Sequence, residues 1–216
     1  MRDMIQNVIL DVDGTLWDTT EIVAGAWNEA IEQDGRSGAW ATPHRLKQLF
    51  GKPMNVIGEL LFTDVSQNVR EKLLDDCVVN EQRVLEEGEH KILFPGVAET
   101  LEALVQAGRK LFVVSNCQCG YIELFLRKNN LEVLVTDFEC YGNTGMSKGE
   151  NIRLVMERNG LNPQETVYVG DTQGDYEATV EAGVPFIFAD YGFGEVSQAE
   201  QRISCFEELL ALVENS

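Results

Sequence analysis

Two aspartates at the end of an apolar run are the residues of this sequence best suited to chemistry. Asp11 and Asp13 follow the segment Val8–Leu10, are separated by a single valine, and are followed directly by Gly14. Along an extended strand, residues two apart share one face, so both carboxylates would point the same way. Buried carboxylates are costly unless a cation neutralises them. Because oxygen ligands favour a hard ion, this segment predicts a Mg²⁺ site at the end of a buried strand.

Polar residues also follow two later apolar runs. Ser115 and Asn116 come after one of them, and Asp171 comes after the other, with Asp175 four residues further on. Lys148 begins a predicted helix between these two motifs. Since parallel strands end at the same edge of a sheet, we expect these side chains to converge. Together with the first two aspartates they supply a nucleophile, an acid, a cation and hydrogen-bond donors, the groups needed for phosphoryl transfer.

Apolar segments of strand length alternate with helical patterns over most of the chain. We predict strands at 8–10, 110–114, 133–138, 166–169 and 185–188, and helices at 21–33, 96–107, 118–129, 148–159, 175–181 and 206–213. Such alternation is typical of an α/β fold with a parallel, Rossmann-like sheet. Between the first and second strands the patterns are only helical, which indicates an inserted all-helical cap domain. We therefore predict an α/β core of residues 1–16 and 93–216 and a helical cap of residues 17–92.

The composition argues against several classes of function. The chain has 216 residues and a formal net charge of −19, which disfavours non-specific binding of nucleic acid or of an anionic membrane surface. No apolar run has the length expected of a signal peptide or a membrane span. With five scattered cysteines and two histidines, we expect neither a disulfide framework nor a zinc site. These features predict a cytoplasmic protein, monomeric or homodimeric.

The ordered motifs resemble those of the haloacid dehalogenase-like hydrolases. They are Asp11-Val12-Asp13-Gly14-Thr15, Ser115-Asn116, Lys148, and Gly170-Asp171 with Asp175. The predicted helical insertion is similar to the cap of the subgroup that contains phosphoglycolate phosphatases and β-phosphoglucomutases. The segment Tyr191-Gly192-Phe193-Gly194, which we place after the last sheet strand, is similar to an aromatic-glycine turn of phosphoglycolate-phosphatase-like members.

The resemblance implies a mechanism in which Asp11 attacks phosphorus and forms an aspartyl-phosphate. Asp13 would protonate the leaving alcohol and then deprotonate the water that hydrolyses the intermediate. Ser115 and Asn116 would hold phosphate oxygens or substrate, and Lys148 would offset the negative charge of Asp11 and the phosphoryl group. One departure from the family is that Lys148 precedes a glycine where many members have proline.

The resemblance also implies that aspartates hold a Mg²⁺ ion. The ion would be bound by the carboxylate of Asp11, the backbone carbonyl of Asp13 and the carboxylate of Asp171. Asp175 would be a further ligand, or would lie behind the ligands and orient Lys148. The predicted partner of this site is a small phosphorylated metabolite.

Three residues close to these motifs are additional candidates. Thr15 ends the first motif and is expected to contact the phosphate. Lys52 lies in a loop of the predicted cap, where it could reach an anionic substrate or simply be solvated. Trp17 could line the site, although packing is the more common role of tryptophan.

Several motif residues also have simpler structural interpretations. Ser115 and Asn116 could cap the helix that follows them. Asp175 could serve only as a negative charge at a helix N-terminus. Lys148 could be an exposed helix lysine, the usual place of that residue type. The presence of all four motifs in order favours the catalytic interpretation.

The function predicted from these residues is a Mg²⁺-dependent phosphatase that hydrolyses a small phosphomonoester, with phosphoglycolate-like substrates favoured and a cap that closes over the site. A mutase similar to β-phosphoglucomutase shares every core motif, and a pyrophosphatase is a further alternative. A phosphonate hydrolase would need a cap lysine that forms an imine, for which Lys52 is the candidate. A haloacid dehalogenase is disfavoured because Asp13 supplies an acid and base that it does not need. A non-catalytic binding protein of the same fold is the remaining class.

Overall fold

A parallel β-sheet organises the core of the protein. The computed structural model describes residues 4–89 and 92–214, and predictions that fall on residues 1–3, 90–91 and 215–216 lie outside it. The six strands run in the order β3-β2-β1-β4-β5-β6, and every neighbouring pair is parallel. They are β1 (Asn7–Leu10), β2 (Lys110–Ser115), β3 (Val135–Cys140), β4 (Thr166–Gly170), β5 (Phe186–Ala189) and β6 (Gln201–Ile203). The predicted Rossmann-like fold is confirmed.

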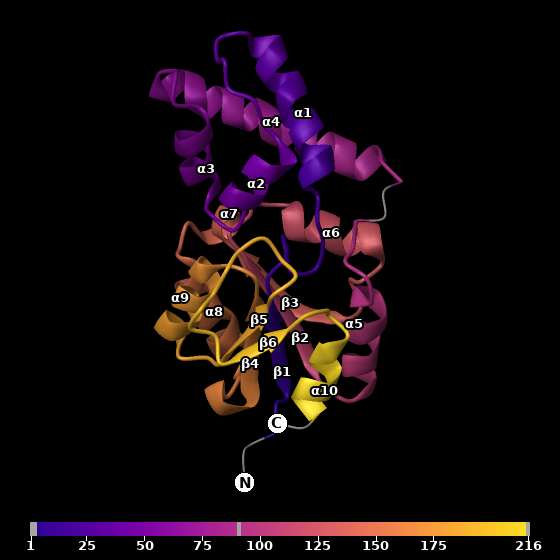
Figure 1. Ribbon diagram of the computed structural model, residues 1–216. Helices are drawn as coiled ribbons and strands as arrows, with labels where there is room; N and C mark the ends of the chain where they lie inside the picture. The colour runs from indigo at the N-terminus through magenta and orange to yellow at the C-terminus, as the bar shows by residue number, and fades with distance from the viewer. Residues whose placement is uncertain (1–3, 90–91, 215–216) are drawn as a thin grey trace.

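Helices cover both faces of the sheet, which explains why the middle residues of its central strands are mostly apolar on both faces (Figure 1). Ile9, Phe112 and Tyr168 face one side and pack with α8 and α9, whereas Val8 and Leu10 face the other. This alternation follows from the two-residue repeat of a strand. The helices of the core are α5 (Val97–Gln106), α6 (Tyr121–Asn129), α7 (Tyr141–Thr144), α8 (Lys148–Asn159), α9 (Gln173–Ala182) and α10 (Glu208–Glu214), with a 3₁₀ turn, η1 (Pro163–Glu165).

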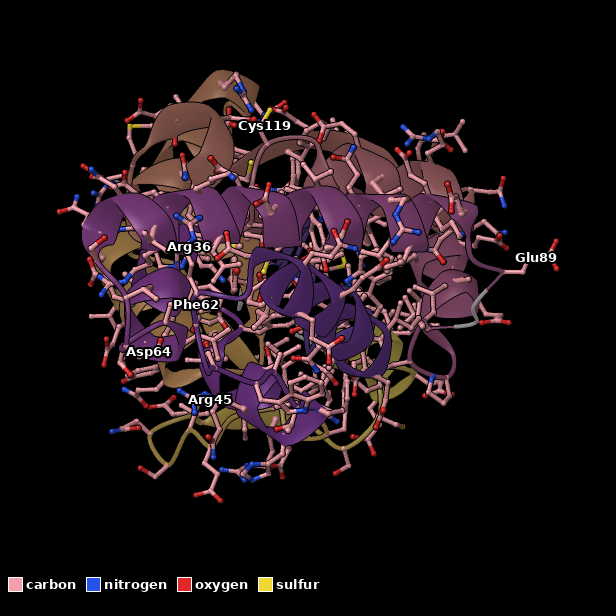
Figure 2. All side chains as sticks on the ribbon, turned by 90° about the horizontal axis from the view of Figure 1, so that it is seen from above. Arg36, Arg45, Phe62, Asp64, Glu89 and Cys119 are labelled. Atoms are coloured by element: carbon pink, nitrogen blue, oxygen red, sulfur yellow. The ribbon has the colours of Figure 1, made fainter. Side chains whose placement is uncertain are left out.

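The predicted helical insertion lies beyond the carboxyl edge of the sheet (Figures 1 and 2). It consists of α1 (Thr20–Asp34), α2 (Pro43–Leu49), α3 (Met54–Leu61) and α4 (Gln67–Glu87). Apolar residues hold this group together, among them Trp27, Leu73 and Cys77, all with no exposed surface. Among the described residues, no helix has both the length and the apolar character needed to cross a membrane. We refer to α1–α4 and their loops as the cap.

Two chain segments connect the cap to the core, and they run side by side. The Asp18 amide donates to the Ile92 carbonyl at 2.9 Å, and the Phe94 amide donates to the Leu16 carbonyl at 3.0 Å. These paired connectors lie next to the predicted boundaries at residues 17 and 92. The exact boundaries remain a prediction.

The structure corrects three details of the predicted elements. The strand predicted at 133–138 spans Val135–Cys140, because Val133 is 91% exposed and lies before the sheet. Helix α7 and strand β6 were not expected, since elements of four and three residues are too short to show a periodic pattern. As a result, the turn at 191–194 precedes the last strand of the sheet instead of following it.

Candidate active site

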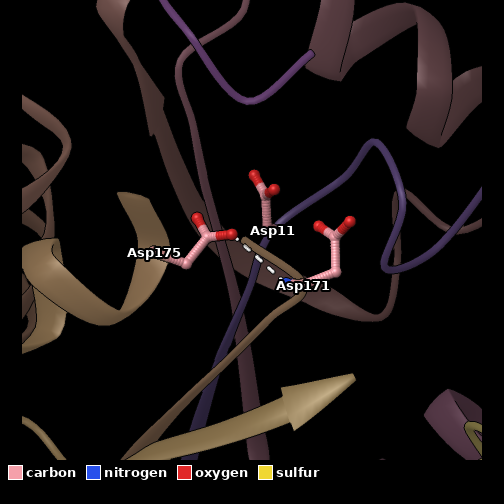
Figure 3. Close-up of side chains that lie close together, drawn as sticks. All are labelled: Asp11, Asp171 and Asp175. Atoms are coloured by element: carbon pink, nitrogen blue, oxygen red, sulfur yellow. Dashed lines mark hydrogen bonds between the residues drawn. The ribbon is translucent and has the colours of Figure 1, made fainter. Parts of the chain in front are cut away.

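Three carboxylates converge where the strand order of the sheet reverses, at β1 and β4 (Figure 3). Asp11 directly follows β1, Asp171 directly follows β4, and Asp175 lies in the first turn of α9. One carboxylate oxygen from each residue lies within 4.8 Å of the other two, and none of the three residues is exposed. Open α/β sheets bind their ligands at such a reversal of strand order. The predicted convergence of these three aspartates is therefore observed.

Lys148 is buried against two of these carboxylates. Its Nζ donates to Asp11 Oδ1 at 3.0 Å and to Asp175 Oδ1 at 2.5 Å. Ser147 and Glu150 form a capping box that fixes the start of α8 and so places Lys148. Burial alone would lower the pKa of Lys148, but the adjacent charges raise it above its usual value, so the side chain is an ammonium ion. The alternative of an exposed surface lysine is wrong.

Asp175 uses both of its oxygens to bind protein groups. Oδ1 accepts from Lys148 and from the Tyr168 hydroxyl at 3.4 Å. Oδ2 accepts from the backbone amides of Asp171 and Thr172 at 3.2 and 2.9 Å, and from the Thr172 hydroxyl at 2.6 Å. This arrangement supports the second of the two predicted roles, in which Asp175 orients Lys148 from behind the ligands.

The loops around Asp171 leave almost no free space beside it. A Cβ on Gly14, whose φ is +84°, would lie 2.1 Å from Asp171 Oδ2, and a Cβ on Gly192 would lie 2.3 Å from Asp171 Cβ. The Phe193 amide donates to Oδ2 at 2.7 Å, and the Thr15 hydroxyl donates to Oδ1 at 3.3 Å. The turn at 191–194 therefore positions Asp171, and Thr15 contacts this carboxylate. Phosphate binding by Thr15 remains a prediction.

The donor set and its charge fit a divalent cation. Asp11 Oδ2 is buried and has no hydrogen-bond partner among the described residues. Three clustered carboxylates share one ammonium group, which leaves an excess of negative charge that a hard cation would balance. Burial raises the pKa of Asp11 to about 6 and that of Asp171 well above its usual range, and the neighbouring carboxylates add to both shifts. Oxygen-rich, uncompensated sites of this kind suit Mg²⁺.

Asp13 lies in a cradle of three donors. Its Oδ1 accepts from the Tyr121 hydroxyl at 2.7 Å, the Trp17 indole N–H at 3.0 Å and the Thr19 hydroxyl at 3.4 Å. Burial raises the pKa of Asp13 to about 8, with a smaller contribution from the neighbouring Asp11 charge. A carboxyl group that stays protonated near neutral pH can donate a proton to a leaving alcohol. Trp17 thus packs against Tyr121 and positions Asp13.

The remaining predicted residues lie around a small cavity of about 20 Å³ between the cap and the core. Ser115 lines it and is 3% exposed. The Asn116 side-chain amide uses one of its two N–H groups to donate to the cap carbonyl of Gly51 at 2.8 Å, which leaves the other N–H group for a ligand. Lys52 also lines the cavity, but its exposed Nζ donates to the Gln48 carbonyl at 3.1 Å. Roles for these residues in substrate binding remain predictions.

Glu81 is a buried carboxylate that lines the same cavity, and no sequence pattern singles it out. It lies on α4, and its two oxygens accept from the Trp27 indole at 2.7 Å and from the Gln118 amide at 3.0 Å. Burial raises the pKa of Glu81 to about 7. The Gln118 bond also joins the cap to the core. Tyr121 and Thr19 of the Asp13 cradle were missed as well, because only tertiary packing brings them to Asp13.

Glu81 is expected to make the stability of the fold depend on pH. Its pKa in the folded protein, about 7, exceeds its ordinary value of 4.5, so the native state binds the proton more tightly. Stability from this group is therefore complete below about pH 4.5 and is lost as pH rises to about 7. Glu81→Gln should be about 3 kcal/mol more stable than the unmodified protein at pH 8 and equally stable near pH 4. Urea unfolding at both pH values measures this difference.

The matched control for that experiment is Glu71→Gln, which removes one negative charge from an exposed position on the same helix. It should change stability by no more than about 0.5 kcal/mol at either pH. A stability difference for Glu81→Gln that does not vary between pH 4 and pH 8 would show that Glu81 keeps an ordinary pKa in the folded protein.

A Rossmann-like sheet with an acidic cluster at its point of strand reversal and a helical insertion after β1 defines the class of this protein. The family profile described as haloacid dehalogenase-like hydrolase matches residues 8–189, and the chain belongs to this family. The resemblance predicted from the four motifs is thereby confirmed.

Curated relatives and solved structures agree with this assignment. The chain is 28% identical to a phosphoglycolate phosphatase of Salmonella typhi, over 95% of this chain and 91% of that protein. It is 29% identical to one of Agrobacterium fabrum, over 92% and 86% of the two chains. A crystal structure of a predicted phosphoglycolate phosphatase from Haemophilus somnus superposes with a TM-score of 0.84 at 20% identity and covers 96% of this chain and 97% of that one. The crystal structure of CbbY from Rhodobacter sphaeroides in complex with phosphate superposes with a TM-score of 0.83 at 22% identity. It covers 99% of this chain and 100% of that one.

Proposed function

We propose that this protein is a Mg²⁺-dependent phosphatase that hydrolyses a small phosphomonoester through an aspartyl-phosphate on Asp11. The observation that carries the proposal is that Asp11 and Asp13, two residues apart, have different surroundings. Asp11 has one oxygen held by Lys148 and a second, buried oxygen without a partner among the described residues. Burial raises the pKa of Asp13 to about 8, which favours its protonated form near neutral pH. A free carboxylate oxygen beside a protonated carboxyl group supplies a nucleophile and an acid.

Each residue of the site has a role in this proposal. Asp11 attacks phosphorus, and Asp13 gives its proton to the oxygen of the leaving alcohol. The resulting Asp13 carboxylate then takes a proton from the water that attacks the phosphorylated Asp11, which restores both groups. Lys148 balances negative charge on Asp11 and the phosphoryl oxygens, and Ser115 donates a hydrogen bond to one of these oxygens.

The metal site supports the same proposal. Asp11, Asp171 and the backbone carbonyl of Asp13 would hold Mg²⁺, with Asp175 behind them. When bound, the ion supplies positive charge that stabilises the phosphoryl oxygens. We also propose a cytoplasmic location, which is supported by the free state of the described cysteines.

Phosphoglycolate is the first candidate substrate because curated relatives that cover most of this chain carry that activity in their names. A phosphosugar mutase is the second candidate function. It needs the same nucleophile and acid and differs only in the acceptor of the phosphoryl group. Pyrophosphate and phosphonates are the remaining alternatives within the family.

A panel of phosphate compounds with and without Mg²⁺ tests the proposed function. We expect Mg²⁺-dependent release of phosphate from at least one small monoester, and a loss of more than about 10²-fold when the ion is removed with a chelator. The panel includes phosphoglycolate, sugar phosphates, nucleotides, pyrophosphate and phosphonoacetaldehyde. Interconversion of sugar phosphates without phosphate release would favour the mutase instead. Turnover that is unaffected by the chelator would contradict the proposal.

A further inference from the structure

The cavity between the cap and the core contains a carboxylate supplied by the cap itself. Glu81 is 3% exposed and lines this cavity together with Asp13 and Ser115. Trp27 and Gln118 each donate one hydrogen bond, to different oxygens of Glu81. Because a carboxylate offers about four lone-pair positions, about two on Glu81 remain able to accept further hydrogen bonds.

A second acceptor lines the same cavity. The Asn116 side chain donates its N–H group to the Gly51 carbonyl, which fixes the orientation of the amide. Its Oδ1 is buried and has no hydrogen-bond partner within the described part of the chain. A buried acceptor of this kind is unfavourable unless a ligand or a water molecule donates to it. The cavity therefore presents two acceptors, one from the cap and one from the core.

The charges around the cavity do not suit a leaving group that carries a carboxylate. Of the described residues that line it, Lys52 is the one cation, and its exposed ammonium group already donates to the Gln48 carbonyl. Glu81, in contrast, is buried, and above pH 7, where it is mostly ionised, its charge is screened little by solvent. A glycolate leaving group would therefore bring a second carboxylate toward Glu81 without a buried cation to balance the pair.

We propose that Glu81 is a specificity residue, which selects phosphomonoesters whose leaving alcohol ends in a hydrogen-bond donor over those that end in a carboxylate. The donor is a hydroxyl or an ammonium group, and the small cavity restricts it to a short alcohol. This inference rests on the proposed function. It keeps a leaving group of the size of glycolate, and it places a donor-bearing ester ahead of phosphoglycolate as the first candidate substrate.

Three esters of equal length, assayed at pH 8 where Glu81 is mostly ionised, separate these possibilities. They are 2-hydroxyethyl phosphate, phosphoethanolamine and phosphoglycolate, which differ only in a terminal hydroxyl, ammonium or carboxylate group. We expect kcat/KM of the unmodified protein to be about tenfold or more higher for at least one donor-bearing ester than for phosphoglycolate, as one hydrogen bond to a charged group allows. The comparison between the first two esters identifies which donor is preferred.

Substitution of Glu81 then assigns the preference to this side chain. Glu81→Gln keeps the shape of the residue, and a flip of the Gln118 amide would preserve both hydrogen bonds, so the variant should fold. We expect it to lower the ratio of donor-bearing ester to phosphoglycolate about tenfold. Glu81→Asp retains the charge and should retain the direction of the preference. Glu71→Gln, on the exposed face of the same helix, should leave the ratio unchanged.

Two results would overturn the inference, and they differ from failure of the proposed function. A preference of the unmodified protein for phosphoglycolate would show that the cavity accepts a carboxylate. A ratio that Glu81→Gln leaves unchanged would show that this side chain does not select the substrate. In both cases Mg²⁺-dependent hydrolysis would persist. Absence of such hydrolysis with all three esters, with p-nitrophenyl phosphate and with the whole panel of phosphate compounds would instead refute the proposed function, and the inference with it.

Discussion

Replacement of Asp11 by asparagine is expected to abolish phosphate release, with a loss of at least about 10⁴-fold in kcat. The amide keeps the shape of the side chain but cannot form an acyl phosphate. Because the buried Asp11 carboxylate is only partly compensated by Lys148, the substitution should not destabilise the metal-free protein. Steady-state kinetics and urea unfolding of the same preparation separate a loss of chemistry from a loss of fold.

The control for this variant is Asp75→Asn, an exposed aspartate on α4 that lies away from the site. It should retain full activity. Mg²⁺-dependent turnover by Asp11→Asn at more than about one hundredth of the original rate would mean that another group attacks phosphorus.

Replacement of Asp13 by asparagine is expected to lower kcat by about 10²–10⁴-fold, the usual contribution of a general acid and base. The variant can still accept hydrogen bonds from Tyr121 and Trp17, so its side chain should stay in place. It can neither protonate a leaving alcohol nor activate water. The defect should therefore depend on the leaving group.

An ester with a good leaving group distinguishes the two steps in which Asp13 acts. p-Nitrophenolate needs little protonation, so phosphorylation of Asp11 in Asp13→Asn should be slowed less with p-nitrophenyl phosphate than with an alkyl phosphate. Hydrolysis of the aspartyl-phosphate should be slowed with both, because it needs the base. A burst of p-nitrophenol followed by slow turnover is the expected trace in rapid-mixing experiments. Equal slowing of phosphorylation with both esters would show that Asp13 does not act as the acid.

The sheet and the acidic cluster could be predicted from the sequence because both depend on short local patterns. An apolar run long enough for one buried strand ends at Leu10, and the carboxylates of Asp11 and Asp13 follow it. The parallel arrangement then brings Asp11 and Asp171 together without any detailed knowledge of packing. The same reasoning placed Lys148, since a helix that packs against a parallel sheet, as α8 does against β2 and β3, begins near the same edge.

The cradle of Asp13 and the cap carboxylate could not be predicted, because each depends on contacts between elements far apart in the chain. Tyr121 lies 108 residues from Asp13, and nothing in the local pattern of α6 marks its hydroxyl as a donor. Glu81 occupies a position on α4 that is buried only because α1 and the core pack over it. A glutamate on a polar helix is ordinarily exposed, so the sequence alone favours the wrong environment.

Covalent labelling of Asp11 provides the decisive measurement. The protein is mixed with Mg²⁺ and ³²P-labelled substrate, quenched in acid within one turnover, and digested for peptide mapping. We expect the label on the peptide that contains Asp11, stable in acid and released by hydroxylamine, with none on Asp11→Asn. Rapid Mg²⁺-dependent phosphate release without any labelled peptide, or with the label on another residue, would contradict phosphoryl transfer through Asp11.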